Sequence, residues 1–122
     1  MTMIVRAFPL RRPVQDLQAF AVALQTDRKE EAAAFYRQFG VSQETWHLQE
    51  TPNGTWVIGV TVADDPSESA PRFAKSSASF DSWFKSQIRQ LSGVDPDKQP
   101  LGPPTTQIYE WVDAQRAGKP LT

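Results

Sequence analysis

The sequence predicts an α+β domain in which helices pack on one face of an antiparallel β-sheet. Two strand-like runs flank Asn53-Gly54, a dipeptide typical of tight β-hairpin turns. Apolar residues recur at helical spacing both before and after this hairpin. With 122 residues the chain has the length of one domain, which we expect to span residues 1–122.

Composition excludes several classes of function. Thirteen basic and fourteen acidic residues give a net charge of -1 without a basic stripe, so we expect no nucleic-acid partner. The chain has no cysteine, and the single His47 cannot form a histidine-rich metal site in one subunit, so we expect no metal and no cofactor. The absence of a secretory signal and of a long apolar run predicts a cytoplasmic protein without a membrane partner.

The first part of the chain predicts a strand and a long helix. Met3 to Phe8 is the first strand, and Pro13 suits the first turn of the helix that follows. This helix is expected from about Val14 to Phe39, with a slight break at the charged run near Thr26. Gly40 supplies the left-handed residue that commonly follows a helix end.

The hairpin from Val41 to Ala63 presents two sets of side chains if its loop has an even number of residues. One face then carries Thr45, His47, Gln49, Thr51, Trp56, Ile58, Val60 and Val62. The other face carries Glu44, Trp46, Leu48, Glu50, Val57, Gly59 and Thr61.

The second half adds a helix and a strand. Residues 64–78 are polar, with at most a short helical turn from Ser69 to Lys75. Ser79 is the expected N-cap of a helix that ends at Gly93, and a final strand spans about 106–112, followed by a tail at 113–122. The resulting order is βαββαβ, which predicts the ferredoxin-like arrangement of a four-stranded antiparallel sheet with two helices on one face.

The two faces of this sheet differ in polarity. We expect the more apolar face, with Met3, Val5 and Ala7 beside Trp56, Ile58, Val60 and Val62, to lie under the helices. The opposite face then holds Ile4, Arg6, Phe8, Trp46, Leu48 and Val57 without a cover. Leaving these side chains in water forgoes on the order of 10 kcal/mol, so we expect a homodimer through this face.

Three short segments, IVRAFPL, GVSQETWHL and FDSWFKSQI, resemble a branch of the dimeric α+β barrel superfamily. This group includes the antibiotic-biosynthesis monooxygenases and the stress-responsive A/B barrel proteins. The resemblance covers roughly residues 3–91. It implies a dimer whose two sheets face each other and enclose a small hydrophobic ligand.

Four residues are candidates for the ligand site. Arg6 and Glu44 share the uncovered face, where Arg6 would hold a carboxylate or enolate and Glu44 would act as a base. The alternative is a structural ion pair. Trp46 would line a pocket for a planar molecule. His47 has the intrinsic pKa of a general base, although alternation places it on the helix side.

The expected function is therefore that of a dimer that binds a small hydrophobic or aromatic ligand between its sheets. One alternative is a cofactor-independent monooxygenase or cyclase that uses the same cavity. Another is a structural interaction module without a ligand.

Overall fold

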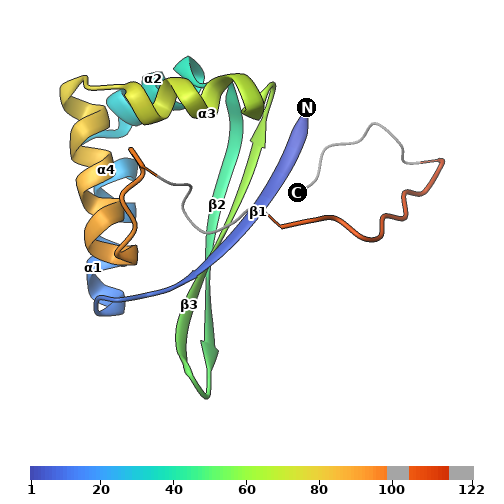
Figure 1. Ribbon diagram of the computed structural model, residues 1–122, viewed down its shortest axis with the longest axis horizontal. Coiled ribbons are helices and arrows are strands. Elements are labelled where there is room, and N and C mark those ends of the chain that lie inside the picture. Colours follow the sequence, from blue (N-terminus) through green and yellow to red (C-terminus); the bar gives the residue numbers. More distant parts are fainter. Residues whose placement is uncertain (99–104, 116–122) are drawn as a thin grey trace.

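The computed structural model describes residues 1–98 and 105–115 and confirms the α+β class. The elements are β1 (Thr2–Pro9), α1 (Val14–Gln25), α2 (Lys29–Gln38), β2 (Val41–Thr51), β3 (Gly54–Ala63), α3 (Pro66–Lys75) and α4 (Ser79–Ser92). The strands form an antiparallel sheet in the order β1-β3-β2. All four of these helices lie on one side of it (Figure 1).

The β2–β3 hairpin has the register that the sequence predicts. Thr51 pairs with Gly54 across a two-residue loop, and Gly54 has a positive φ of 118°. Further along, Trp46 lies opposite Gly59 and Leu48 opposite Val57. The one irregularity in this pairing is a bulge between residues 41 and 43, at the far end from the loop, so it leaves the alternation of faces intact.

The single helix expected from Val14 to Phe39 is two helices, α1 and α2. The chain leaves the first helix at Thr26, whose Oγ1 donates a hydrogen bond of 2.7 Å to the Val22 carbonyl. Such local side-chain bonds compete with helix continuation, and the charged residues that follow gain little from burial. The predicted stop at Gly40 is confirmed by its φ of 69°.

Helix α3 is longer than the turn expected from Ser69. Pro66 occupies its first position, and the Asp65 carboxylate accepts a hydrogen bond of 3.3 Å from the backbone N–H of Glu68. This cap satisfies a backbone donor at the start of the helix, which outweighs the interruption by Pro71 inside it.

Helix α4 ends where the sequence predicts. It starts at Ser79 and is closed by Gly93, whose φ is 74°. The prediction of Ser79 as the N-cap is wrong, because Ser79 is the first helical residue, the N-cap is Ala78 and no side chain accepts a capping hydrogen bond there.

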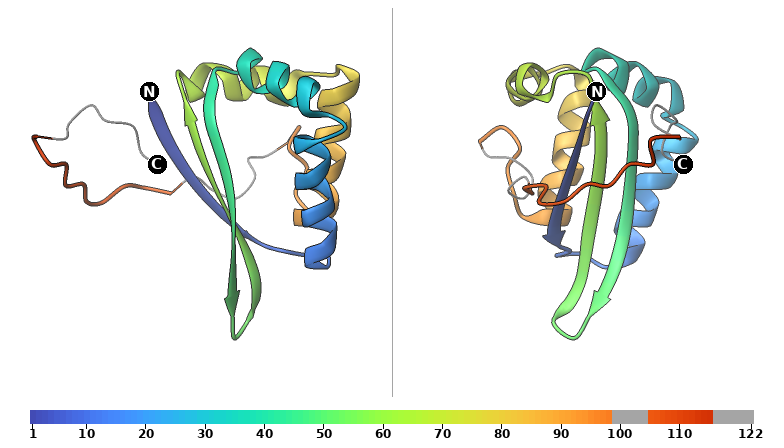
Figure 2. Two further views of the ribbon diagram at one scale, coloured as in Figure 1. Left: turned by 180° about the vertical axis from the view of Figure 1, so that it is seen from behind. Right: turned by 90° about the vertical axis from the view of Figure 1, so that its right-hand side faces the viewer.

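The predicted fourth strand is absent from the sheet. Residues 105–112, here called the outer segment, belong to no strand in the described part of the chain. The Thr105 N–H donates a hydrogen bond of 3.2 Å to the Val5 carbonyl, after which the segment runs away from the sheet (Figure 2). The prediction of a four-stranded sheet is therefore wrong for a single chain. Residues 116–122 of the predicted tail lie outside the described residues.

The helices cover the sheet face that we expected to be bare. Val57 is buried in the core, and the Trp46 ring lies 5.2 Å from the ring of Phe20 on α1. Because residues alternate along a strand, Arg6 and Glu44 also point towards the helices. The other set forms an uncovered surface, here called the open face: Met3, Val5, Ala7, Thr45, His47, Gln49, Trp56, Ile58, Val60 and Val62.

The physical reason for this reversal lies in the helices. They bring a cluster of aromatic side chains to the interior, centred on Phe35, whose ring lies 4.7 Å from that of Phe84. These rings supply the apolar burial that we had assigned to the strands, so the strand face beneath them can carry polar groups.

Candidate functional site

A cavity of about 430 Å³ lies between the helix-facing side of the sheet and helices α2, α3 and α4. Its walls are mostly apolar and include Ile4, Phe35, Phe39, Val41, Phe73 and Ile88. A smaller cavity of about 100 Å³ lies towards α1 and is also lined by Phe20 and Trp46. Arg6, Glu44 and Thr61 line both cavities.

The sheet register brings these polar side chains together. On the central strand β3, Thr61 is paired with Glu44 on one side and Ile4 on the other. Gly59 is paired in the same way with Trp46 and Arg6. The side chains therefore converge from β1 and β2 over the middle of β3.

Gly59 keeps the floor of the site open. A Cβ atom at this position would lie 3.9 Å from Glu44 Oε2 and 4.0 Å from Trp46 Cδ1. These are ordinary contact distances, so alanine would fit, whereas a longer side chain would enter the smaller cavity. A glycine within a strand is typical of places where something must approach the backbone closely.

Glu44 is held by two neighbouring donors. Trp46 Nε1 donates to Oε2 at 2.9 Å, and Thr61 Oγ1 donates to Oε1 at 2.7 Å. Burial raises the pKa of the Glu44 carboxyl, and these two hydrogen bonds and the charge of Arg6 offset only part of that rise. The carboxyl is thus fixed in position and takes up a proton more readily than an exposed glutamate.

Arg6 has a buried donor without an acceptor. Its Nε atom finds no hydrogen-bond partner, and in the described part of the chain the guanidinium forms no ion pair within 4.0 Å. An unsatisfied buried donor costs roughly 1–3 kcal/mol, more when it is charged. A hydrogen-bond acceptor placed next to the Arg6 Nε–H would therefore remove this cost.

Tyr36 adds a hydroxyl group from α2 to the larger cavity. Burial, and after it the negative charge of Glu44, raises the pKa of this phenol well above its ordinary value. Tyr36 therefore stays protonated at neutral pH and can donate a hydrogen bond.

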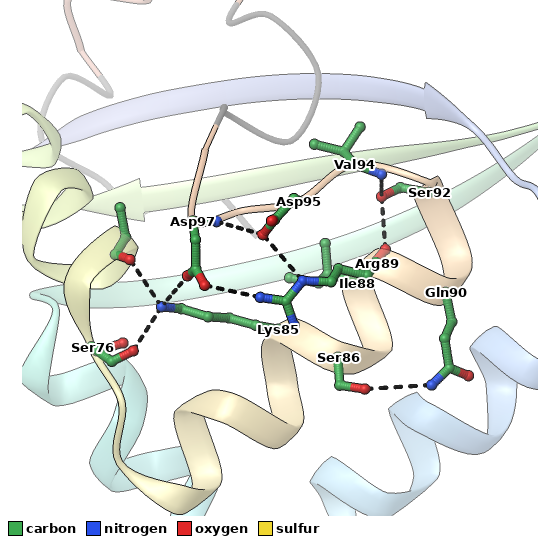
Figure 3. A network of polar contacts seen from close by, with 11 residues as sticks. Ser76, Lys85, Ser86, Ile88, Arg89, Gln90, Ser92, Val94, Asp95 and Asp97 are labelled. Carbon is green, nitrogen blue, oxygen red and sulfur yellow. Dashed lines mark hydrogen bonds and ion pairs between the residues drawn. The ribbon is translucent and has the colours of Figure 1, made fainter.

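Lys85, a buried lysine on α4 (Figure 3), contacts Ala74 and Asp97, two residues that line the larger cavity. Lys85 is 2% exposed, and its Nζ lies 2.6 Å from Asp97 Oδ1, 2.8 Å from the Ser76 carbonyl and 3.2 Å from the Ala74 carbonyl. Arg89 pairs with the same Asp97 at 2.9 Å. These contacts tie the end of α3 and the segment after α4 to the body of the molecule.

The structure brings three of the four predicted site residues together. Arg6, Glu44 and Trp46 meet, but beneath the helices rather than on the uncovered face. His47 lies on the open face, exposed, with Nε2 3.0 Å from Thr45 Oγ1. Arg6 and Glu44 share one face of the sheet, as alternation predicts, but that face lies beneath the helices and not on the uncovered side. Their role in binding a ligand stays a prediction.

Sequence reasoning missed three contributors, Tyr36, Gly59 and Thr61. Each carries a signal that could have identified it. Tyr36 is the one hydroxyl-bearing residue in the apolar stripe of its helix, and Gly59 interrupts an otherwise β-branched and aromatic strand. Thr61 follows Gly59 by two residues on the same face of β3 and is paired with Glu44 in the hairpin.

Across residues 1–98 and 105–115, no group of three or more His, Cys, Asp or Glu side chains is placed to hold a metal ion. Among the helices described here, none has the length and apolar character needed to cross a membrane. The expectations of no cofactor, no nucleic-acid partner and a cytoplasmic location stay predictions.

Comparison of the chain with models of protein families, with curated proteins and with solved structures found no match. The resemblance to dimeric α+β barrels likewise stays a prediction, and the proposed function rests on the geometry of the site.

Proposed function

We propose that this chain binds a small, largely apolar or aromatic molecule that carries one anionic or hydrogen-bond-accepting group. The proposed site is the cavity between the sheet and the helices. Its volume of about 430 Å³ falls within the roughly 300–1,000 Å³ of small-molecule sites. Apolar walls with a few convergent polar groups, here Arg6, Tyr36 and Glu44, are also typical of such sites.

The observation that carries this proposal is the unpartnered Nε of Arg6. A carboxylate, phenolate or enolate oxygen would supply the missing acceptor, and hydrogen bonds between charged partners are about twice as strong as neutral ones. Glu44 sets a condition on such a ligand, because an ionised carboxyl would repel an anion. Binding of an anion should therefore favour the protonated form of Glu44, which its raised pKa makes accessible.

A bicyclic aromatic carboxylate such as naphthoate is a suitable probe, with its neutral amide as the chemical control. We expect naphthoate to bind the wild-type chain in calorimetry more tightly than the amide. Arg6→Met should weaken binding by about 10- to 150-fold, because a hydrogen bond to a charged group is worth roughly 1.5–3 kcal/mol. Arg12→Met is the matched control, since Arg12 is exposed and pairs with Asp16 outside the cavity.

Equal affinity of Arg6→Met and the wild-type chain would contradict a role for Arg6 in binding. If neither naphthoate nor a wider set of aromatic acids and lipids binds, the interaction module without a ligand becomes the better description.

A second candidate is a cofactor-independent enzyme at the same site, and the raised pKa of Glu44 favours it. In this case the ionised Glu44 would take a proton from an acidic C–H or O–H of an aromatic or polyketide-like substrate. Arg6 would stabilise the enolate or phenolate that results. A cyclase would then add this carbanion to a carbonyl carbon of the same substrate, and the carbonyl oxygen would receive the electron pair and take the proton back from Glu44. A monooxygenase would add dioxygen to the carbanion, with the substrate as the reductant, one oxygen atom kept in the product and the other released as water.

Solvent deuterium exchange at an acidic C–H position of a bound aromatic ketone probe distinguishes the two candidates. Exchange that Glu44→Gln abolishes, while the probe still binds, supports an enzyme. Binding without exchange in the wild-type chain supports a binding protein.

We also propose that the chain forms a homodimer through the open face. In a single chain this face leaves a row of apolar side chains partly exposed, among them Met3, Trp56, Ile58, Val60 and Val62. Monomeric proteins seldom expose a contiguous apolar patch of more than a few hundred Å². Light scattering tests this proposal, and a stable monomer would contradict it without affecting the cavity, which lies within one chain.

A further inference from the structure

The outer segment, residues 105–112, carries several large apolar side chains that are highly exposed. Ile108 is 94% exposed, Tyr109 79% and Trp111 72%. In an extended chain Tyr109 and Trp111 share one side and Ile108 lies on the other. Aromatic residues are rarely left in water to this extent in a single chain, so the segment has the properties of a contact surface that lacks its partner.

This segment lies on the same side of the sheet as the open face. It begins at β1, where Thr105 bonds to Val5, and the sheet separates it from all four described helices (Figure 2). The segment stands away from the open face of its own chain (Figure 1). The molecule thus has an uncovered apolar surface and, projecting beside it, an exposed apolar strip that does not cover it.

We propose that the outer segment of one chain lies across the open face of a second copy. This inference rests on the proposed homodimer and specifies its contacts: Tyr109 and Trp111 of one chain pack against Trp56, Ile58 and Val60 of the other. In a two-fold dimer the same contact occurs twice, because each chain supplies both a segment and a face.

The area available supports this arrangement. Buried aromatic side chains remove roughly 150–250 Å² each from water. With Tyr109 and Trp111 from two segments, and with the sheet surface that they cover, the buried area reaches roughly 1,200–2,000 Å², the range of stable interfaces. In a two-fold dimer of this chain, each segment covers the open face of the other copy, so both surfaces are covered at once.

The experiment uses the absence of cysteine from the chain. Ile108→Cys carries a single nitroxide spin label on a chain without isotope label, and this chain is mixed with isotope-labelled wild-type chain. The indole N–H signals of the labelled chain then report only on contacts between chains. Trp56 lies on the open face, whereas Trp46 and Trp83 pack with the core and serve as internal controls. A label at Gln18→Cys on α1, an exposed position on the helix side, is the matched control.

We expect the label at residue 108 to attenuate the Trp56 indole signal, to leave those of Trp46 and Trp83 largely intact, and to lose its effect on chemical reduction. Light scattering on the same sample reports the oligomeric state. A dimer without attenuation at Trp56 would overturn the contact of the outer segment and leave the homodimer standing. A monomer would overturn both.

A second measurement avoids the spin label. The double variant Tyr109→Ser/Trp111→Ser should weaken dimerisation by at least about tenfold, because buried aromatic anchors commonly contribute more than 1 kcal/mol each. Glu110→Gln, in the same segment, should leave the dimer constant within about twofold. Because these residues are exposed in the single chain, loss of folding is not expected, and unchanged dimerisation of the double variant would overturn the proposal.

Discussion

Glu44 is an acidic residue that is partly buried between the sheet and the helices. Its carboxyl is removed from water by the helices, yet it keeps two donors, Trp46 and Thr61, and lies in the field of Arg6. Burial has the larger effect, so the pKa in the folded chain lies above the 4.5 of an exposed glutamate. Between these two pKa values the folded chain holds more protons than the unfolded chain, and its stability therefore falls as pH rises.

We expect Glu44→Gln to remove this pH dependence. The neutral amide resembles the protonated carboxyl, so the stability of the variant relative to the wild-type chain should increase as pH rises above 4.5 and then level off above the folded pKa. Urea unfolding between about pH 4 and pH 8 measures the difference.

Asp65→Asn provides the comparison. The hydrogen bonds from Ser67 and Glu68 lower the pKa of Asp65, so its contribution is present above 3.8 and is lost only as pH falls through the lower, folded pKa. Its effect on stability should therefore be constant over the measured range. If the free energy of unfolding changes with pH in the same way in Glu44→Gln and in the wild-type chain, the Glu44 pKa is not raised.

At the scale of elements, Lys85 holds α3 and the residues after α4 in place. Its three N–H donors are matched by Asp97 and by the carbonyls of Ala74 and Ser76. Helix α3 contains Pro71, which lacks a backbone N–H, so its own hydrogen bonds hold it less firmly than those of an uninterrupted helix. The contact with Lys85 compensates for this weakness.

We expect Lys85→Met to destabilise the chain by roughly 1–3 kcal/mol, because the partly buried carbonyls of Ala74 and Ser76 lose their donor while the apolar stem is kept. Asp97 retains Arg89, so no carboxylate is left alone. Urea unfolding gives the free energy, and hydrogen exchange should show faster exchange in α3 than in α1.

Lys75→Met, an exposed change on α3, should stay within about 0.5 kcal/mol of the wild-type chain. A similar loss in both variants would contradict a specific role for Lys85.

Elements with strong local signals could be predicted from the sequence. Asn53-Gly54 determined the hairpin and its register, and Gly93 marked the end of α4. The break between α1 and α2 was underestimated, since a continuous apolar stripe hides a local competition at Thr26. Helix α3 was underestimated because Pro71 suggests a stop, whereas Pro66 and Asp65 form a favourable start.

At the scale of the molecule, the alternation of side chains along the strands shows which residues share a face of the sheet. It does not show which of the two faces lies against the helices. Arg6, Glu44 and Trp46 were correctly placed on one face, and His47 on the other. The choice between faces assumed that the more apolar one lies inside. That assumption fails where the helices supply most of the core themselves, as Phe35 and Phe84 do here.

We expect Val60→Lys to prevent dimerisation while the single chain stays folded. Val60 lies on the central strand, and its side chain is on the open face, where a charge would be buried without a partner in the dimer. Light scattering should show a monomer, and naphthoate affinity should match that of the wild-type chain.

Gln18→Lys, which adds the same charge on the exposed side of α1, should remain dimeric. Persistence of the dimer in Val60→Lys would contradict an interface through this face.

Strand β3 is a single layer of backbone with the cavity on one side and the open face on the other, and its successive residues Ile58, Gly59 and Val60 belong to the two sides in turn. Inserting or deleting one residue there would move each following side chain of the strand to the opposite face. The apolar side chains of the open face would then point inward, and the side chains that line the cavity would point outward. Both faces of the strand therefore require the alternation of side chains to be kept. A change in the length of the strand would be tolerated only if it adds or removes two residues at a time.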